Sequence, residues 1–156
     1  VENYFKNNEL LSSELGFINF IVGKKSFTID INKKKYDKGI IFEVPRFSLI
    51  QSITFNIFDD LLIGNFMKTK VLGFGGKQLY PIFNPIIPKY YDQAKIKTKN
   101  ELKEYYKFYF NKNKINFIFE ILKYQTSMVI RKNISTNNKL YQNIGKLRKI
   151  GLKDFF

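Results

Sequence analysis

The chain of 156 residues contains no cysteine, no histidine and no tryptophan. Without cysteine and histidine it cannot form disulfides, Cys/His zinc sites or thiol nucleophiles, and it lacks the most common general base. No apolar run approaches the roughly 18 residues that cross a bilayer, and the first residues lack the order typical of a signal peptide. We therefore expect a protein that is not an enzyme, with no catalytic residue, no metal site, no cofactor, no small-molecule substrate and no transmembrane segment.

Alanine and arginine are also scarce. The chain has one alanine, Ala94, and three arginines, whereas lysine, asparagine, isoleucine, phenylalanine and tyrosine abound. This composition is typical of an extremely AT-rich genome. Part of the lysine content therefore reflects codon usage rather than selection for a ligand.

Positive charge is nevertheless in clear excess, with 27 basic against 13 acidic residues and a net charge of +14. Such a balance indicates a polyanionic partner, which is RNA, DNA or an anionic membrane face. Residues 1–88 carry 11 basic and 8 acidic side chains, whereas residues 89–156 carry 16 and 5. Because codon usage acts on the whole gene, this asymmetry favours a binding surface.

In the first half of the chain, apolar and polar residues alternate as they do in β-strands. Residues 16–22 and 26–31 predict a hairpin around Gly23, and residues 40–44 predict a further strand that Pro45 ends. A fourth strand is expected at residues 47–57. Residues 1–15 are polar and acidic, and we expect a lead-in to the fold.

A change of period follows at residues 58–70. The apolar residues there have helical spacing, Asp59 and Asp60 would lie at the N-terminal end, and Lys68 and Lys70 at the C-terminal end. An acidic helix start is the preferred interpretation of Asp59 and Asp60, because a metal or acid-base site would need another carboxylate nearby. The expected fold is therefore α+β, an antiparallel sheet with one packed helix, over residues 16–88.

Residues 89–156 predict a basic, aromatic-rich and mainly helical extension. Thr98 and Glu101 have the spacing of a capping box. Residues 114–124 fit a helix about as well as a buried strand, and residues 138–151 predict a basic amphipathic helix. The aromatic residues 105–110 lie between lysines, so they suit either base stacking or packing, and packing is preferred. We interpret the terminal Asp154 to Phe156 as an apolar anchor on a neighbouring protein.

The segment from Val71 to Pro88 contains a Gly-Gly-Lys sequence between the helix and three prolines. A Walker loop would need glycine at Val71 and a hydroxyl at Gln78, so a nucleotide cradle is disfavoured. Glycine has no Cβ, and such a loop can lie close along a phosphate backbone. The candidate RNA-binding residues are those of this loop and its approach, together with the basic cluster of the tail: Lys68, Lys70, Gly75, Gly76, Lys77, Arg131, Lys132, Lys146, Arg148 and Lys149.

Three short motifs occur in the order found in a known family. "GIIFEVPRFSLI" (39–50), "FDDLLIG" (58–64) and "FGGKQL" (74–79) each resemble a stretch of the large-ribosomal-subunit protein called L-six. Gly39, Ile40, Glu43, Val44, Pro45 and Ile50 are identical in the first, Asp59, Leu62 and Gly64 in the second, and Gly76 and Lys77 in the third. Gly75 stands where the family has a lysine, and Gln78 where it has a second glycine.

The resemblance covers about residues 16–83 and only the second of the family's two sheet-plus-helix repeats. It implies a structural protein of the large subunit that binds rRNA near the factor-binding region and contacts neighbouring ribosomal proteins. The AT-rich composition and the basic extension suit a mitochondrial ribosome.

An alternative from another class stays open. It is an accessory subunit of an organellar membrane protein complex, with its aromatic helices on protein partners and its lysines on anionic lipid.

Overall fold

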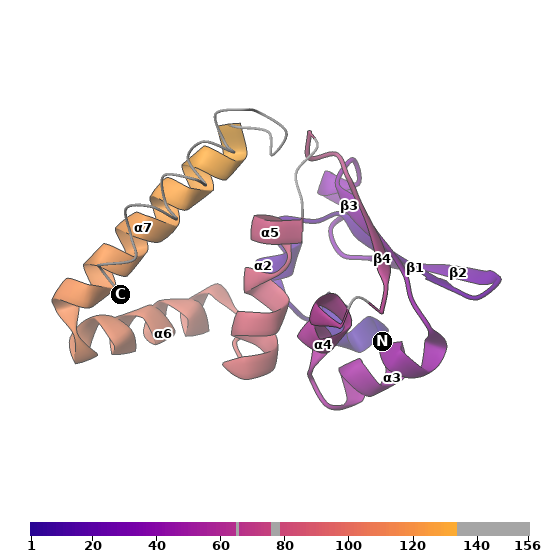
Figure 1. Ribbon diagram of the computed structural model, residues 1–156, viewed down its shortest axis with the longest axis horizontal. Helices are drawn as coiled ribbons and strands as arrows, with labels where there is room; N and C mark the ends of the chain where they lie inside the picture. Colours follow the sequence, from indigo (N-terminus) through magenta and orange to yellow (C-terminus); the bar gives the residue numbers. More distant parts are fainter. Residues whose placement is uncertain (65, 76–78, 134–156) are drawn as a thin grey trace. The chain divides into compact units, whose positions relative to one another are not determined.

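The computed structural model describes residues 1–64, 66–75 and 79–133 (Figure 1). Within these residues the strands are β1 (Phe17–Val22), β2 (Lys25–Asp30), β3 (Gly39–Glu43) and β4 (Lys68–Leu72). The helices are α1 (Glu2–Lys6), α2 (Glu9–Ser12), the 3-10 helix η1 (Lys33–Lys35), α3 (Arg46–Thr54), α4 (Phe58–Ile63), α5 (Leu79–Ile82), the π-helix η2 (Pro85–Gln93), α6 (Lys99–Lys112) and α7 (Lys114–Asn133).

The chain divides into two compact units, Val1–Asn111 and Lys112–Phe156. The first unit contains the whole sheet and extends beyond residue 88, where we placed the end of the sheet-plus-helix domain.

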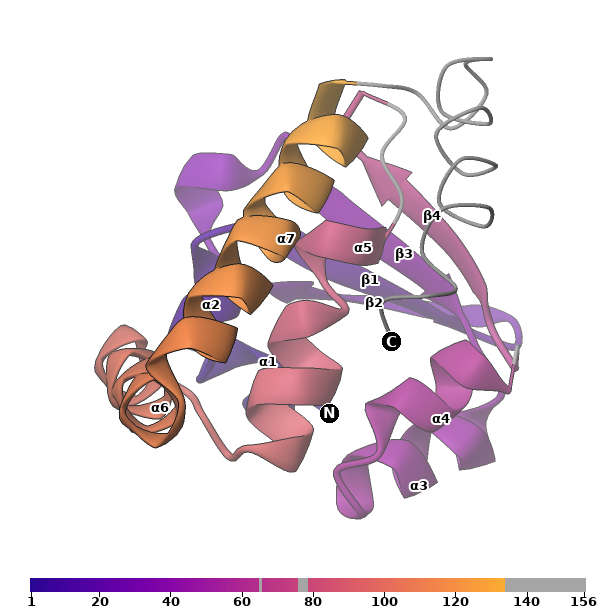
Figure 2. The same cartoon turned by 60° about the vertical axis from the view of Figure 1, so that its left-hand side comes forward.

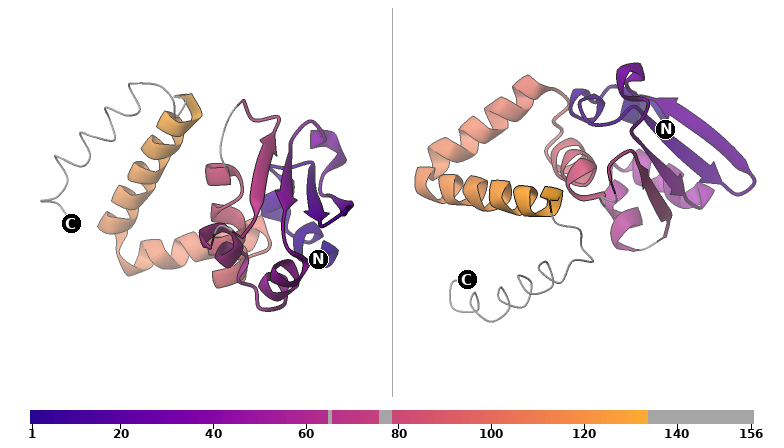
Figure 3. Two further views of the ribbon diagram at one scale, coloured as in Figure 1. Left: turned by 45° about the vertical axis from the view of Figure 1, so that its right-hand side comes forward. Right: turned by 90° about the horizontal axis from the view of Figure 1, so that it is seen from above.

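The strands form one sheet in the order β2-β1-β3-β4, and the α+β class is confirmed. The sheet is mixed rather than antiparallel, because β1 and β3 run in the same direction. β2 ends at Asp30, which pairs with Phe17 at the start of β1. The chain then crosses this end of β1 and enters β3 at Gly39, which pairs with Phe17 from the other side. Since β3 starts at the same end of the sheet as β1, the two strands are parallel. The β1–β2 hairpin projects beyond the helices in two of the views (Figures 1 and 3).

The segment expected as a fourth strand is instead helix α3, so that prediction was wrong. Phe47 and Phe55, which a strand would have buried, are 70% and 65% exposed. The buried positions are Leu49 and Ser52, three residues apart. The apolar residues of this segment satisfy helical as well as strand spacing, and packing against α4 decides between them.

Helix α4 is shorter than the predicted helix and ends at Ile63, before Gly64. Asp59 and Asp60 lie in its first turn, as predicted. Lys68 and Lys70 do not lie at a helix end but on β4, which pairs antiparallel with β3 and satisfies the backbone groups of that strand. The prediction of one helix through residue 70 was therefore wrong.

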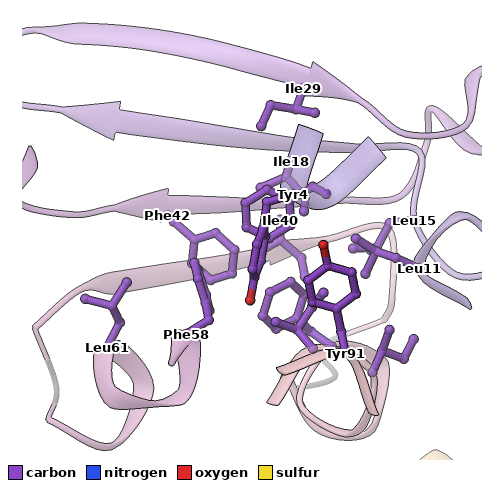
Figure 4. Packing of buried hydrophobic residues seen from close by; sticks show 14 of the residues in the cluster. Tyr4, Leu11, Leu15, Ile18, Ile29, Ile40, Phe42, Phe58, Leu61 and Tyr91 are labelled. Carbon is purple, nitrogen blue, oxygen red and sulfur yellow. The ribbon is translucent and has the colours of Figure 1, made fainter. Parts of the chain in front are cut away.

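Helices cover one face of the sheet and form the core with it (Figures 2 and 4). Five phenylalanines are fully buried, and their rings pack in tilted or T-shaped pairs with centroids mostly 5.2 to 5.6 Å apart: Phe5, Phe20, Phe42, Phe58 and Phe83. A fully buried side chain of this size contributes about 1.5 to 3 kcal/mol.

The first fifteen residues belong to this core. Helices α1 and α2 supply four buried hydrophobic side chains, those of Tyr4, Phe5, Leu10 and Leu11, and Leu15 just after α2 supplies a fifth. The backbone N–H of Glu9 donates to the Lys97 carbonyl at 2.9 Å, and the Lys99 N–H donates to the Glu9 carboxylate at 2.9 Å. Residues 1–15 are thus part of the packed unit rather than a lead-in.

A buried carboxylate connects three elements of the core. Asp92 of η2 is only 4% exposed. It accepts hydrogen bonds from the Tyr4 hydroxyl of α1 and, at 2.9 Å, from the Phe58 N–H at the start of α4. Burial raises the pKa of Asp92, although both hydrogen bonds favour the charged form.

The proline-rich segment forms the π-helix η2, with Pro85 at its first turn and Pro88 inside it. Both prolines are buried, so this segment is part of the core. Helix α6 packs on η2 through Tyr105 and Tyr106, whose rings contact Tyr90. The Thr98–Glu101 capping box forms as predicted, with the Glu101 N–H donating to the Thr98 hydroxyl and the Thr98 N–H to the Glu101 carboxylate.

The second unit contains α7, which resolves the open choice for residues 114–124 in favour of a helix. Several apolar side chains of α7 are exposed: Ile115, Ile118, Phe119 and Leu122. Among the helices of the described residues, none combines the length and apolar character that crossing a bilayer requires. The predicted helix at 138–151 and the terminal anchor lie outside the described residues.

Candidate nucleic-acid interface

The face of the sheet opposite the core is formed by alternate residues of the four strands. The strand register aligns them in three rows: Asp30, Phe17, Gly39 and Leu72; Thr28, Asn19, Ile41 and Lys70; Ser26, Ile21, Glu43 and Lys68. Except for Gly39, these residues are exposed or half-buried. This open face is where a partner can reach the sheet.

A basic loop, defined here as Asn32–Lys38, crosses the end of the sheet at the first of these rows. It contains four lysines in seven residues, Lys33, Lys34, Lys35 and Lys38. Hydrogen bonds fix its course. The Asn32 N–H donates to the Gly16 carbonyl at 2.9 Å, and the Gly16 N–H donates to the Lys38 carbonyl at 2.8 Å. The Asn32 side chain also donates to the Ser12 carbonyl at 2.9 Å, which ties the loop to α2.

Two glycines let the loop lie against its neighbours. A Cβ at Gly16 would lie 2.0 Å from the Lys35 carbonyl oxygen, and one at Gly73 would lie 2.1 Å from the Asp37 carbonyl oxygen. Both contacts are with backbone, which cannot rotate away. The backbone of the basic loop therefore approaches its neighbours closely on both sides, at two positions where a side chain would not fit.

The loop that follows β4 lies directly beside the basic loop. Gly73 contacts Asp37, and the Lys38 ammonium lies 5.8 Å from the centre of the Phe74 ring. Gly75 has φ of +60°, and a Cβ there would meet nothing within 4 Å. The backbone of this second loop is thus open to a ligand at Gly75, next to the lysines of the first loop.

An aromatic pair marks the same end of the open face. The Tyr36 ring lies 5.0 Å from the Phe17 ring at an angle of 37°. A Cβ at Gly39 would lie 2.3 Å from the Phe17 ring, so the ring lies across the glycine backbone of β3. The Asp30 carboxylate beside the Tyr36 hydroxyl raises the pKa of Tyr36. Tyr36 itself is 51% exposed.

No family model, curated protein or solved structure matches the chain. The resemblance to the L-six family stays a prediction based on the residues quoted above.

The sequence-predicted site residues fall into four groups. Lys70 and Gly75 lie near the basic loop, on β4 and just after it. Lys68 lies on β4 two residues before Lys70, further from the basic loop, and forms an ion pair with Glu43 at 3.4 Å. It borders a hollow of about 510 Å³ at the opposite end of the sheet. Arg131 and Lys132 belong to α7, whereas Gly76, Lys77, Lys146, Arg148 and Lys149 lie outside the described residues.

The basic loop and the aromatic pair were missed as site residues. "NKKKYDKG" (32–39) is an obvious charged stretch, but a run of lysines is usually a solvated loop. The sequence also offers no sign that Gly16 and Gly73, which are 57 positions apart, enclose this loop. Among the predicted aromatic cluster, Tyr105 and Tyr106 pack on η2 as preferred, whereas Phe108 and Tyr109 are exposed.

Proposed function

We propose that this chain is a non-enzymatic structural constituent of the large ribosomal subunit of a mitochondrial ribosome. It binds rRNA through the loop after β4, the basic loop and the basic tail, and it contacts neighbouring ribosomal proteins. The observation that carries the proposal is the meeting of two loops at one end of the sheet, one rich in lysine and one with glycine backbone exposed.

The charges at this end of the sheet suit a phosphate backbone. Positive side chains outnumber negative ones there. The negative ones are Asp30 and Asp37, and the positive ones are five lysines on the basic loop or on β4 near it: Lys33, Lys34, Lys35, Lys38 and Lys70. Lys35 donates to the Ser13 carbonyl and Lys38 lies over Phe74, which leaves Lys33, Lys34 and Lys70 exposed. Phosphate contacts of this kind position an RNA without reading its sequence.

The ribosome is favoured over other RNA partners by the resemblance to the L-six family. Its third motif, residues 74–79, includes Phe74 and Gly75 of the loop beside the basic loop. The net charge of +14 on 156 residues agrees with a protein whose binding energy comes mainly from phosphate contacts.

Sedimentation of the native particle tests the proposal. The chain should travel with large-subunit particles at low salt and leave them as salt rises, because released counterions favour dissociation. Absence from these particles at low salt would refute the proposal. Retention on detergent-solubilised membranes after ribosomes are removed would instead favour the accessory subunit of a membrane complex.

Substitutions at the predicted contacts supply a second test. Replacing Lys77, or Arg148 together with Lys149, should weaken RNA binding to a similar extent for every sequence. A loss confined to one RNA sequence would contradict binding through phosphates.

A further inference from the structure

The exposure of Tyr36, the outer member of the aromatic pair, is not explained by the fold. Tyr36 lies outside the core and exposes half of its surface, yet it contacts two neighbouring residues. Its ring contacts Phe17, and its Cα is one of the atoms that a Cβ at Gly16 would strike, at 2.7 Å. An aromatic ring that is both held and exposed can bind a flat ligand at low entropic cost.

The lysines near Tyr36 indicate which kind of flat ligand would bind there. Lys33 and Lys34 precede it by three and two residues, and Lys70 lies on the open face two residues from the row that contains Phe17. All three lysines are exposed. An aromatic surface beside lysines matches a base joined to its phosphates, and stacking on such surfaces is the usual way in which proteins bind unpaired nucleotides.

We propose that Tyr36, supported by Phe17, stacks on one unpaired base of the bound RNA while Lys33, Lys34 and Lys70 contact its phosphates. This inference rests on the proposed function and deepens it, because it identifies single-stranded RNA as the ligand of the open face. Stacking tolerates any base, so the site selects unpaired nucleotides rather than a sequence.

The chain has no tryptophan, so one introduced tryptophan is a selective probe of this site. Tyr36→Trp in the full chain should lose fluorescence on addition of single-stranded oligouridine, because a stacked base quenches indole emission. The matched control is Phe47→Trp, an exposed aromatic position of α3 beyond the opposite end of β3. Its emission should not change. A thermal melt of each variant shows that it is folded.

Affinity supplies the second measurement. Tyr36→Ala should bind oligouridine about tenfold more weakly, whereas Tyr36→Phe, which keeps the ring, should bind as the wild type does. Binding of an RNA duplex of the same length should change little in either variant, because its bases are already stacked.

The outcomes separate the two proposals. Wild-type binding of RNA without quenching of Tyr36→Trp, or with equal quenching of Phe47→Trp, would overturn the stacking site and leave the proposed function standing. No binding of large-subunit rRNA by the wild type would overturn both. Equal quenching of Tyr36→Trp by phosphatidylglycerol vesicles would overturn the assignment to RNA in favour of a membrane surface.

Discussion

Replacement of Asp92 by alanine should destabilise the sheet-bearing unit strongly. The change removes the acceptor of two buried donors, the Tyr4 hydroxyl and the Phe58 N–H. A buried donor left without a partner costs about 1 to 3 kcal/mol, so the two together cost about 2 to 6 kcal/mol. Burial of the Asp92 carboxylate is itself unfavourable, as its raised pKa indicates, and the variant removes this cost. We therefore expect a net loss in the lower half of that range, about 2 to 3 kcal/mol.

Urea denaturation followed by circular dichroism measures this loss. A domain of this size has a free energy of unfolding of about 5 to 15 kcal/mol, so Asp92→Ala should remain folded in water with a clearly lower midpoint. Asp60→Ala is the matched control, because Asp60 is an exposed aspartate of α4 with no hydrogen bond of its side chain among those described. Equal losses in the two variants would refute the role of Asp92 in joining α1, α4 and η2.

Two further predictions follow from the glycine contacts and from the pKa of Asp92. Gly73→Ala should weaken both stability and RNA affinity without any change of charge, because its Cβ would strike the Asp37 carbonyl oxygen. Gly75→Ala has a similar positive φ but open space around the Cβ, so its loss of stability should be only that of the backbone strain, about 1 kcal/mol. Equal losses of stability in the two variants would contradict the close approach of Gly73 to the basic loop. The folded-state pKa of Asp92 is raised, so its contribution to stability is present below the unfolded pKa and is lost as pH rises through the folded pKa. The wild type should therefore gain stability relative to Asp92→Asn as pH falls from 7 toward about 4, measured by urea titrations; a gain in the opposite direction would show that the hydrogen bonds outweigh burial.

Local patterns in the sequence predicted the elements that depend on local chemistry. The alternation of residues 26–31, the glycine at position 23 and the Thr98–Glu101 spacing correspond to a hairpin and a helix cap in the structure. Each of these features is decided within a few residues. The α+β class was predicted from the strands together with the helix that begins at residue 58, and it is confirmed.

Features decided by distant contacts were not predictable in this way. Helix α3 has apolar residues that suit a strand equally well, and only its packing on α4 makes the difference. The parallel pairing of β1 with β3 depends on the path of the basic loop, which Gly16 and Gly73 permit from either side. Of the candidate site, the sequence thus predicted Lys70 and Gly75. The basic loop and Tyr36 were not predicted, because their place beside the sheet depends on these distant contacts.

The most direct test of the account compares two pairs of neighbouring lysines that lie at opposite ends of β2. Lys33 and Lys34 belong to the basic loop, whereas Lys24 and Lys25 lie at the hairpin turn. Both double variants to glutamine remove the same charge. The affinity of each full-length variant for large-subunit rRNA is measured as a function of salt concentration.

We predict that the Lys33/Lys34 variant binds more weakly, with a salt dependence shallower by about one unit of slope for each lysine that contacts a phosphate. The Lys24/Lys25 variant should bind as the wild type does. Equal losses in both variants would show that only the total charge matters, and an unchanged Lys33/Lys34 variant would show that RNA does not bind at this end of the sheet. Either result would contradict the central claim.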